Sequence, residues 1–479
     1  MLYKWFVILI FAFLYTFRLL EVPTGLTVDE AAFGYNAALL SETGRDENSR
    51  SWPVFVLSIE GKDWRQPVTE YFVVFLYKLF GPSVFLLRFS SVLIAVISLW
   101  LFYKLAETVL GKKSGLWAVL VLGSSPLFFI HARLGLDNIM PVPFTILWLW
   151  TISKFLKTGT KNWLLLSGLA LGVAFYTYKG MRAIVPLWSL LTIIMIVKKV
   201  GWQKWFSVEV LYFVVSILPF VLMIPILDHF YAGAVMGGSR PAGNSIYELA
   251  SAYLSSYDWS YLFVRGDITL YHSTGLHGVL LLATLPLLVI GLVSILKKLD
   301  NPKKLILYSL IIAPLFYGFV GSQHRFSRLL ALLPMLVLLI VNGIVWIRDY
   351  KGKAYKYLVT ILLLLSFLNF GDFLKYYFVT YPGVTQSLVG EMKGYKDFEV
   401  LKKVAEQKKL DPVISNTIGD KTNQSHNFYQ AVYFGKLLPT RNDDLGAVEG
   451  EILLTQREKI VGNKAENYPL DKYFLQVKE

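Results

Sequence analysis

The chain alternates between blocks of about 20 apolar residues and shorter polar gaps, and such blocks can cross a hydrocarbon core roughly 30 Å thick. The first block covers residues 3–20, where Lys4 precedes the apolar run and no small-residue cleavage site follows, so we expect an uncleaved span. Further spans are expected at residues 84–109, 115–130, 138–156, 163–178, 183–197, 206–226, 277–296, 305–320, 329–347 and 357–370. The pattern predicts an all-α polytopic membrane protein with about eleven transmembrane helices.

Two long polar stretches interrupt this pattern, at residues 21–83 and 227–276. In the first, residues 71–80 are predicted to form a short amphipathic helix in the membrane interface, which ends at Gly81-Pro82. The second contains turn signals at Gly237-Gly238, Arg240-Pro241 and Gly243-Asn244. We expect both stretches to be outer loops of a transmembrane domain that covers residues 1–370.

After Gly371 the chain becomes polar, and no later run is long enough to span a membrane. Residues 371–479 are predicted to form a small soluble α/β domain, which is short for an independent domain and should pack on the outer loops. The expected elements are helices at 397–408 and 425–434 and strands at 412–417, 451–455 and 473–477. The expected core positions are Val413, Ile414, Ile452, Leu453 and Leu454.

Composition and charge agree with a membrane protein. The 479 residues are 55% hydrophobic and 17% charged, whereas soluble proteins carry roughly 25% charged residues. The net charge of +14 comes largely from lysine-rich gaps between spans, at residues 112–113, 154–161, 198–204, 297–304 and 348–356. Such gaps face the cytoplasm. The protein is therefore expected in the plasma membrane with a cytoplasmic N-terminus and an extracytoplasmic C-terminus, and the charge indicates no nucleic-acid partner.

The chain has no cysteine, which excludes disulfides, thiolate catalysis and cysteine-based zinc sites. We predict no cofactor, and a divalent metal is compatible with the sequence but not indicated. His272 and His277 are five residues apart in a loop, and this spacing does not identify a metal site.

Thr27-Val28-Asp29-Glu30, just after the first span, is the most informative stretch. A desolvated carboxylate is a stronger base and could deprotonate an acceptor hydroxyl. The alternative is structural, because Thr27 with Glu30 three residues later forms a capping box for a helix that ends near Gly44. The two interpretations are compatible: Asp29 can be the base on a helix start that Thr27 and Glu30 hold.

Tyr178-Lys179-Gly180 lies at the outer end of a predicted span. A lysine there could extend to the interface without further function. Basic residues are disfavoured on the outer side, however, and a phosphate ligand would explain this exception.

Two further outer segments carry arginines. In residues 131–137, Arg133 and Asp137 are four apart and could pair, with Asp137 capping the next helix, or Arg133 could bind an anion. In residues 321–328, Arg325 and Arg328 stand at the mouth of a span and could bind an anion or extend to the interface.

In this order, the segments resemble those of the protein O-mannosyltransferase and aminoarabinose transferase superfamily over residues 1–200 and, more loosely, 260–340. The segments are Asp29-Glu30-Ala31-Ala32-Phe33-Gly34, Gln66-Pro67 with Tyr71, Arg88-Phe89-Ser90-Ser91, residues 131–137, Tyr178-Lys179-Gly180 and residues 325–334. Gln66-Pro67 stands where the family has a double proline, and the sugar-binding repeats of the eukaryotic enzymes are absent.

The resemblance implies the GT-C fold, with outer loops 21–83 and 227–276 as catalytic loops. It implies an inverting hexosyl- or pentosyltransferase that takes sugar from a polyprenyl-phosphate carrier, with a protein, a glycolipid or a cell-wall glycan as acceptor. Asp29 is then the catalytic base, and Lys179 contacts the carrier phosphate. The other candidate substrate-binding residues are Glu30, Arg88, Arg133, Asp137, Tyr178, His272, Arg325 and Arg328.

Two other functions are considered. A transporter or lipid flippase should show inverted repeats and helices broken near mid-membrane, and the sequence shows neither. A structural subunit of a transfer complex would not require Asp29, Lys179 and the outer arginines together.

Overall fold

The computed structural model describes residues 2–235, 245–317, 323–350, 352–389, 393–420, 423–442, 445–458, 465–470 and 472–478. The turn signals at 237–244 and Gly321-Ser322 lie outside the described residues. By compactness the chain divides into two units. The first, the helical unit, comprises Met1–Leu19 and Ser91–Tyr381, and the second, the α/β unit, comprises Leu20–Ser90 and Pro382–Glu479. The sequence-based boundary at residues 370/371 stays a prediction.

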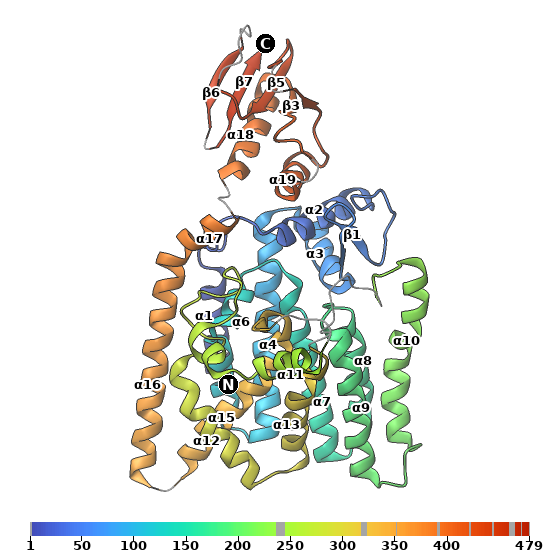
Figure 1. The fold of residues 1–479 in the computed structure, drawn as a ribbon, viewed down its shortest axis with the longest axis vertical. Coiled ribbons are helices and arrows are strands. Elements are labelled where there is room, and N and C mark those ends of the chain that lie inside the picture. Colours follow the sequence, from blue (N-terminus) through green and yellow to red (C-terminus); the bar gives the residue numbers. More distant parts are fainter. Residues whose placement is uncertain are drawn as a thin grey trace. The chain divides into compact units, whose positions relative to one another are not determined.

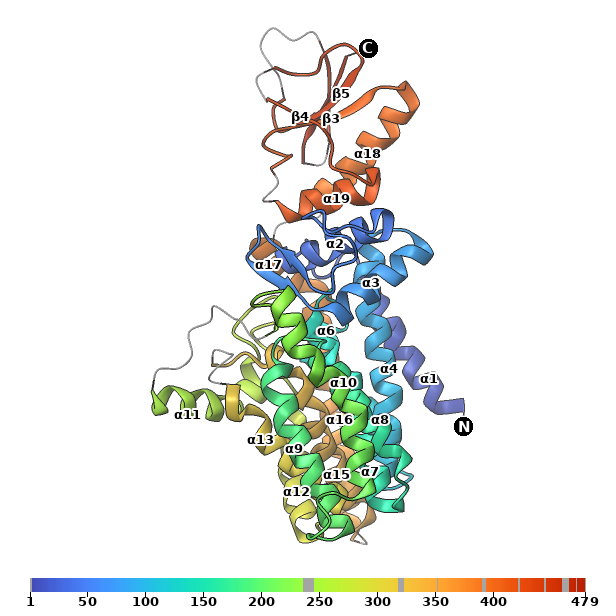
Figure 2. The same cartoon turned by 90° about the vertical axis from the view of Figure 1, so that its right-hand side faces the viewer.

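The helical unit is an assembly of apolar helices, several of which run side by side (Figures 1 and 2). Its helices are α1 (Leu2–Thr16), α5 (Gly115–Gly123), α6 (Pro126–His131), α7 (Pro141–Thr158), α8 (Asn162–Phe175), α9 (Met181–Val200), α10 (Val208–Phe230), α11 (Ile246–Ser255), α12 (Leu285–Lys297), α13 (Asn301–Ile312), α15 (Leu333–Asp349) and α16 (Lys353–Lys375). The helix α4 (Val84–Leu110) begins in the α/β unit and continues into this one.

The protein is a multi-pass membrane protein. Within the described residues, six helical segments are long and apolar enough to cross a bilayer: Val84–Leu110, Asp137–Thr158, Met181–Val200, Val208–Phe230, Phe326–Asp349 and Tyr355–Leu388. Shorter apolar helices cover Lys4–Thr16, Asn162–Phe175 and Leu282–Lys297. The total of about eleven spans stays a prediction.

Several expected spans differ from the structure in physically understandable ways. The expected helix 115–130 is broken between α5 and α6, because the Ser124 and Ser125 hydroxyls donate to carbonyls one turn back and Pro126 opens a new helix. Residues 277–281 are not helical, and a 3-10 turn at Leu282–Thr284 precedes α12. The last span, expected to end at residue 370, is longer, because α16 runs on to Lys375 and a further helix, α17 (Tyr381–Val389), follows.

Small residues allow the closest helix packing. A Cβ on Gly291 of α12 would lie 1.8 Å from the carbonyl oxygen of Leu339 in α15. Asn342 on α15 donates to the Gly291 carbonyl at 2.9 Å and to the Ser294 hydroxyl at 2.7 Å. Glycine at the crossing and a satisfied amide beside it are typical of helix contacts in membranes.

The α/β unit has two parts along the chain. The first comprises α2 (Val28–Thr43), an antiparallel hairpin of β1 (Val56–Ser58) and β2 (Asp63–Arg65), and α3 (Pro67–Phe80). The predicted interfacial helix is thus present, begins earlier than expected and ends at Gly81. The side chains of Phe75, Leu79 and Phe80 are exposed, which fits the predicted place at a membrane surface.

The second part is a mixed sheet with two helices. Its elements are α18 (Lys393–Lys408), β3 (Asp411–Ser415), α19 (Gln424–Phe434), β4 (Thr440–Arg441), β5 (Glu451–Thr455), β6 (Glu466–Pro469) and β7 (Phe474–Lys478). The strand order is β4-β3-β5-β7-β6, with β3 parallel to β4 and β5 and with β7 antiparallel to β5 and β6. All five predicted core positions are buried. The short strands β4 and β6 were not predicted.

The two parts of the α/β unit share one hydrophobic core, as expected for a C-terminal segment too short to fold alone. Helix α19 packs against α2, and Phe428 lies directly over Gly34. A Cβ on Gly34 would be 2.4 Å from the Phe428 ring, so only glycine allows this approach.

Candidate functional site

The start of α2 is fixed by a capping box. The Thr27 hydroxyl accepts from the Glu30 amide at 3.1 Å, and the Glu30 carboxylate accepts from the Thr27 amide at 3.2 Å. The predicted box is therefore confirmed. It sets Asp29 in the first turn of the helix, where backbone N–H groups and the helix dipole favour a negative charge.

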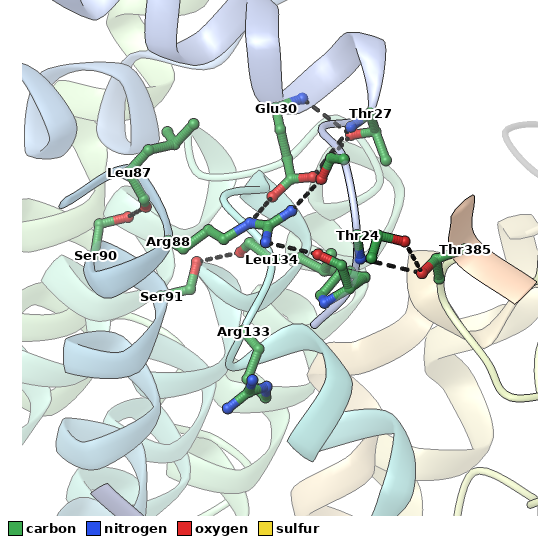
Figure 3. A network of polar contacts seen from close by, with 12 residues as sticks. Thr24, Thr27, Glu30, Leu87, Arg88, Ser90, Ser91, Arg133, Leu134 and Thr385 are labelled. Carbon is green, nitrogen blue, oxygen red and sulfur yellow. Dashed lines mark hydrogen bonds and ion pairs between the residues drawn. The ribbon is translucent and has the colours of Figure 1, made fainter. Parts of the chain in front are cut away.

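Glu30 and Arg88 form an ion pair in which both side chains are fully buried, with 3.1 Å between Glu30 Oε1 and Arg88 Nε (Figure 3). Arg88 also donates to the carbonyls of Pro23 and Gly25. These contacts hold the loop that leads into α2. They favour a structural role for both residues over the predicted contact with substrate.

The same loop is held a second time, from the C-terminal segment. The Thr24 hydroxyl lies 2.8 Å from the Thr385 hydroxyl (Figure 3). It also donates to the Pro382 carbonyl at 2.8 Å. The position of Asp29 thus depends on Arg88, on the capping box and on the segment after residue 381.

Asp29 itself remains accessible. Its side chain is 45% exposed, and its Oδ1 lies 3.0 Å from Nη1 of Arg65, whose side chain is 4% exposed. Arg65 also donates to the Ser58 hydroxyl at 2.7 Å and lies 3.6 Å from Asp63 Oδ2. The guanidinium stands 4.8 Å from the centre of the Phe33 ring. The expected desolvation of Asp29 is not seen, and its environment is set by a buried arginine instead.

Arg65 was not predicted. Its position directly before Gln66-Pro67 is the one sequence feature that could have drawn attention to it. No local pattern connects Arg65 with Asp29 across 36 residues. The pairing arises because β1 packs on α2 and β2, which carries Arg65, pairs with β1.

In the helical unit, Arg133 is buried and donates to the carbonyls of Leu14, Tyr15 and Arg18 at 2.9, 2.7 and 3.2 Å. These bonds satisfy carbonyls at the end of α1, which otherwise lack intrahelical partners. They favour a structural role for Arg133 over the anion site.

Asp137 opens a short 3-10 turn, Asp137–Ile139, rather than capping the following helix. The cap position of α7 is Met140, so the predicted cap is wrong. The next residue, Asn138, donates to the Ser327 carbonyl at 3.0 Å and so ties this turn to the arginine-bearing segment.

Gly180, the residue after Tyr178-Lys179, lies close to the Arg328 backbone. A Cβ on Gly180 would be 2.7 Å from the Tyr178 ring and 3.3 Å from the Arg328 carbonyl oxygen. Tyr178, Lys179 and Arg328 are all partly buried, and the two distant segments that carry them meet at Gly180 within one unit.

His272 joins the same region. Its ring stacks on that of His131, with 4.8 Å between centroids and 13° between planes. Burial lowers the pKa of His272 well below its usual value, and the nearby charges of Arg325 and Arg328 add to this effect. Asp267 links the loop to the arginines, because it accepts from the Ser327 amide at 2.9 Å.

His277 makes its polar contacts with residues other than His272. His277 Nδ1 lies 3.0 Å from the Thr274 hydroxyl, and its Nε2 lies 3.2 Å from Asp372 Oδ2. Across the parts of the chain that the structure describes, no group of three or more His, Asp or Glu side chains could hold a metal ion.

Comparisons with known proteins agree with the resemblance found in the sequence. Residues 65–229 match the family model of dolichyl-phosphate-mannose-protein mannosyltransferase, a range that begins at Arg65 and does not include Asp29. No curated protein matches the sequence.

Solved structures share the fold across nearly the whole chain. ArnT from Cupriavidus metallidurans in the apo state is 12% identical, with 98% of this chain and 96% of that one covered and a TM-score of 0.57. The same protein bound to undecaprenyl phosphate gives 12% identity, 98% and 97% coverage and a TM-score of 0.53. The apo oligosaccharyltransferase of Archaeoglobus fulgidus is 12% identical, with 93% of this chain and 66% of that one covered and a TM-score of 0.51. At this identity the similarity establishes the fold alone.

Proposed function

We propose that this chain, whose residues 65–229 match the mannosyltransferase family, is an integral-membrane inverting glycosyltransferase. It moves a sugar from a polyprenyl-phosphate carrier to an acceptor hydroxyl on the outer side of the plasma membrane. The family match and the fold shared with ArnT support this class of reaction. The acceptor is a protein, a glycolipid or a cell-wall glycan.

The observation that carries the proposal is the setting of Asp29. A half-exposed carboxylate stands in the first turn of α2, 3.0 Å from a buried arginine, on a helix start fixed by a capping box and a buried ion pair. A group held in this way can accept a proton from a bound hydroxyl with little reorganisation. A purely structural acid would not need to remain accessible.

In the proposed step, the acceptor oxygen bonds to the anomeric carbon from the face opposite the phosphate. The acceptor proton passes to Asp29, and the sugar–phosphate bond breaks with its electron pair remaining on the phosphate. No covalent sugar–enzyme intermediate forms, so configuration inverts. Phosphate is a good leaving group, and a paired general acid is therefore less necessary than in glycosidases.

Lys179 and Arg328 are proposed to contact the carrier phosphate, with Tyr178, Arg325 and His272 around them. A lysine ammonium is a suitable partner for a phosphodiester, and fixed positive charge stabilises the leaving group as the bond breaks. A neutral, buried His272 could donate or accept a hydrogen bond without adding charge.

Reconstitution tests the whole proposal. Purified protein in liposomes is given a panel of undecaprenyl-phosphate hexoses and pentoses labelled in the sugar, together with serine- and threonine-containing peptides, membrane glycolipid and cell-wall glycan. We expect label to move from the lipid to one acceptor, with inverted anomeric configuration. Transbilayer movement of the labelled lipid without transfer would instead identify a flippase. If the protein showed neither activity, both the transferase and the flippase functions would be contradicted.

A further inference from the structure

One face of α2 carries more of the candidate site than Asp29. Asp29, Phe33 and Asn36 are spaced four and three residues apart, so they lie along the same face of the helix. The Arg65 guanidinium stands over the Phe33 ring and pairs with Asp29. At 1.5 Å per residue, Asn36 lies about 10 Å along the helix from Asp29.

Asn36 holds a second carboxylate, that of Glu47. The Asn36 amide donates to Glu47 Oε1 at 3.2 Å, and its oxygen accepts from the Glu47 backbone amide at 3.0 Å. Asn36 is fully buried, so this double contact fixes the Glu47 backbone and side chain together.

The other Glu47 oxygen is held from the C-terminal segment. Gln424, the first residue of α19, donates to Glu47 Oε2 at 3.4 Å across 377 residues of sequence. Gln424 is itself buried, at the point where α19 packs on α2.

Several ionisable groups interact electrostatically with Glu47. Arg65 is the cation that acts on it, Asp46 is the neighbouring anion, and the Tyr35 phenol lies within electrostatic range. Burial raises the pKa of Glu47, and the donors Asn36 and Gln424, together with Arg65, oppose this rise. Asp29 and Asp63 are the other carboxylates that share Arg65.

We infer that Glu47 is a positioning residue for the Asp29–Arg65 pair and that Gln424 places this residue under the control of the C-terminal helix α19. The inference rests on the proposed function of Asp29. When Glu47 is charged, it shares the positive charge of Arg65 and leaves Asp29 less tightly paired. When Glu47 gains a proton, the charge of Arg65 is shared only with Asp29 and Asp63. Asp29 is then paired more strongly and becomes a weaker acceptor of protons.

Two variants should move the acidic limb of the rate–pH profile in opposite directions. Glu47→Gln removes the charge permanently, so we expect kcat to fall about tenfold and the acidic limb to lie about one pH unit lower. The limb should also become less steep, because one titrating group is lost. Gln424→Ala removes a donor that favours the charged form of Glu47, so proton uptake at Glu47, and with it the loss of rate, should begin at higher pH.

The measurement is initial transfer rate against pH in the reconstituted system, with the donor of the panel that gives most product. Glu42→Gln on the exposed end of α2 and Gln407→Ala on the exposed face of α18 are the matched controls, and both should keep the wild-type profile. Glu47→Asp keeps the charge and is expected to retain the wild-type limb, although with lower kcat.

Opposite shifts with unchanged controls support the inference. If neither acidic limb moves, or if both move in the same direction, the inference is wrong. If Glu47→Gln does not fold, the shift of the Gln424→Ala limb decides: a shift to higher pH supports the inference, and any other result contradicts it. Asp29→Asn in the same assay distinguishes a failure of the proposed catalytic base from a failure of the positioning role of Glu47. Transfer by Asp29→Asn would refute the base itself, whereas an inactive Asp29→Asn beside unshifted Glu47 and Gln424 variants would refute only the positioning role.

Discussion

Glu30 and Arg88, which are 58 residues apart in sequence, form an ion pair with both side chains fully withdrawn from solvent. Burying two charges is expensive, and such pairs contribute little net stability, but removing one partner leaves the other charge uncompensated. The pair organises the loop that leads into α2. It therefore changes what is expected when Glu30 is substituted.

Glu30→Gln should destabilise the protein by about 3 kcal/mol, because Arg88 keeps its buried charge and loses its counter-ion. From the capping box alone, a milder effect would be expected, since glutamine can still reach the Thr27 amide. Thermal unfolding of the single variants and of Glu30→Leu/Arg88→Met distinguishes these cases. A double variant more stable than Glu30→Gln identifies the uncompensated charge as the cause, and a wild-type melting temperature for Glu30→Gln would contradict it.

Asp29→Asn should abolish transfer while leaving folding and donor binding close to wild type. The amide keeps the size of the side chain but cannot take up the acceptor proton. Initial rates are compared with those of Glu42→Gln, a matched loss of charge on the same helix. Substantial activity in Asp29→Asn, with a folded but inactive Glu30→Gln, would reverse the roles of the two acids.

Lys179→Ala should lower transfer by roughly two orders of magnitude, comparable to the loss of one donor to a developing oxyanion. Both donor affinity and the chemical step should suffer, because the phosphate gains charge as the bond breaks. Lys198→Ala, in the last turn of α9, is the control. If Lys179→Ala turns over like the wild type, the lysine only extends to the interface.

Mild acid should destabilise the α/β unit through His426. Its Nδ1 lies 2.9 Å from the Ile418 carbonyl and its Nε2 lies 2.7 Å from the Tyr473 hydroxyl, and burial lowers its pKa to about 4. The unfolded chain, with a pKa near 6.5, takes up the proton first. Stability is therefore present above about pH 6.5 and is lost progressively as the pH falls toward 4, by at most roughly 3 kcal/mol.

Melting temperatures at pH 7.5 and pH 5 measure this effect. His426→Gln should reduce the pH dependence by the share of this one histidine, whereas His229→Gln, which changes an exposed histidine, should keep all of it. Equal pH dependence in His426→Gln and the wild type would assign the effect to other groups.

Orientation is tested with single cysteines, because the natural chain has none. Gln407 and Lys298 are exposed positions in the C-terminal segment and in a lysine-rich gap. In intact cells, an impermeant thiol reagent should label Gln407→Cys but not Lys298→Cys. The reverse pattern would overturn the predicted topology.

The sequence by itself determined the features that depend on neighbouring residues. The capping box at Thr27, the end of α3 at Gly81 and the change from membrane helices to a mixed α/β segment follow from periodicity and capping over a few residues. The identity of Asp29 as the candidate base also came from a local motif. The short strands β4 and β6 had too few residues to produce such a signal.

Only the tertiary structure decided which side chains meet. Arg65 reaches Asp29 across 36 residues, and Gln424 reaches Glu47 across 377. Arg88 and Arg133 carry the charge expected of ligand contacts, yet each is buried and hydrogen-bonded to carbonyls of its own unit. A motif shows that a charge is present, but whether that charge meets a ligand or a backbone carbonyl depends on chain segments that the fold brings together from far apart in sequence.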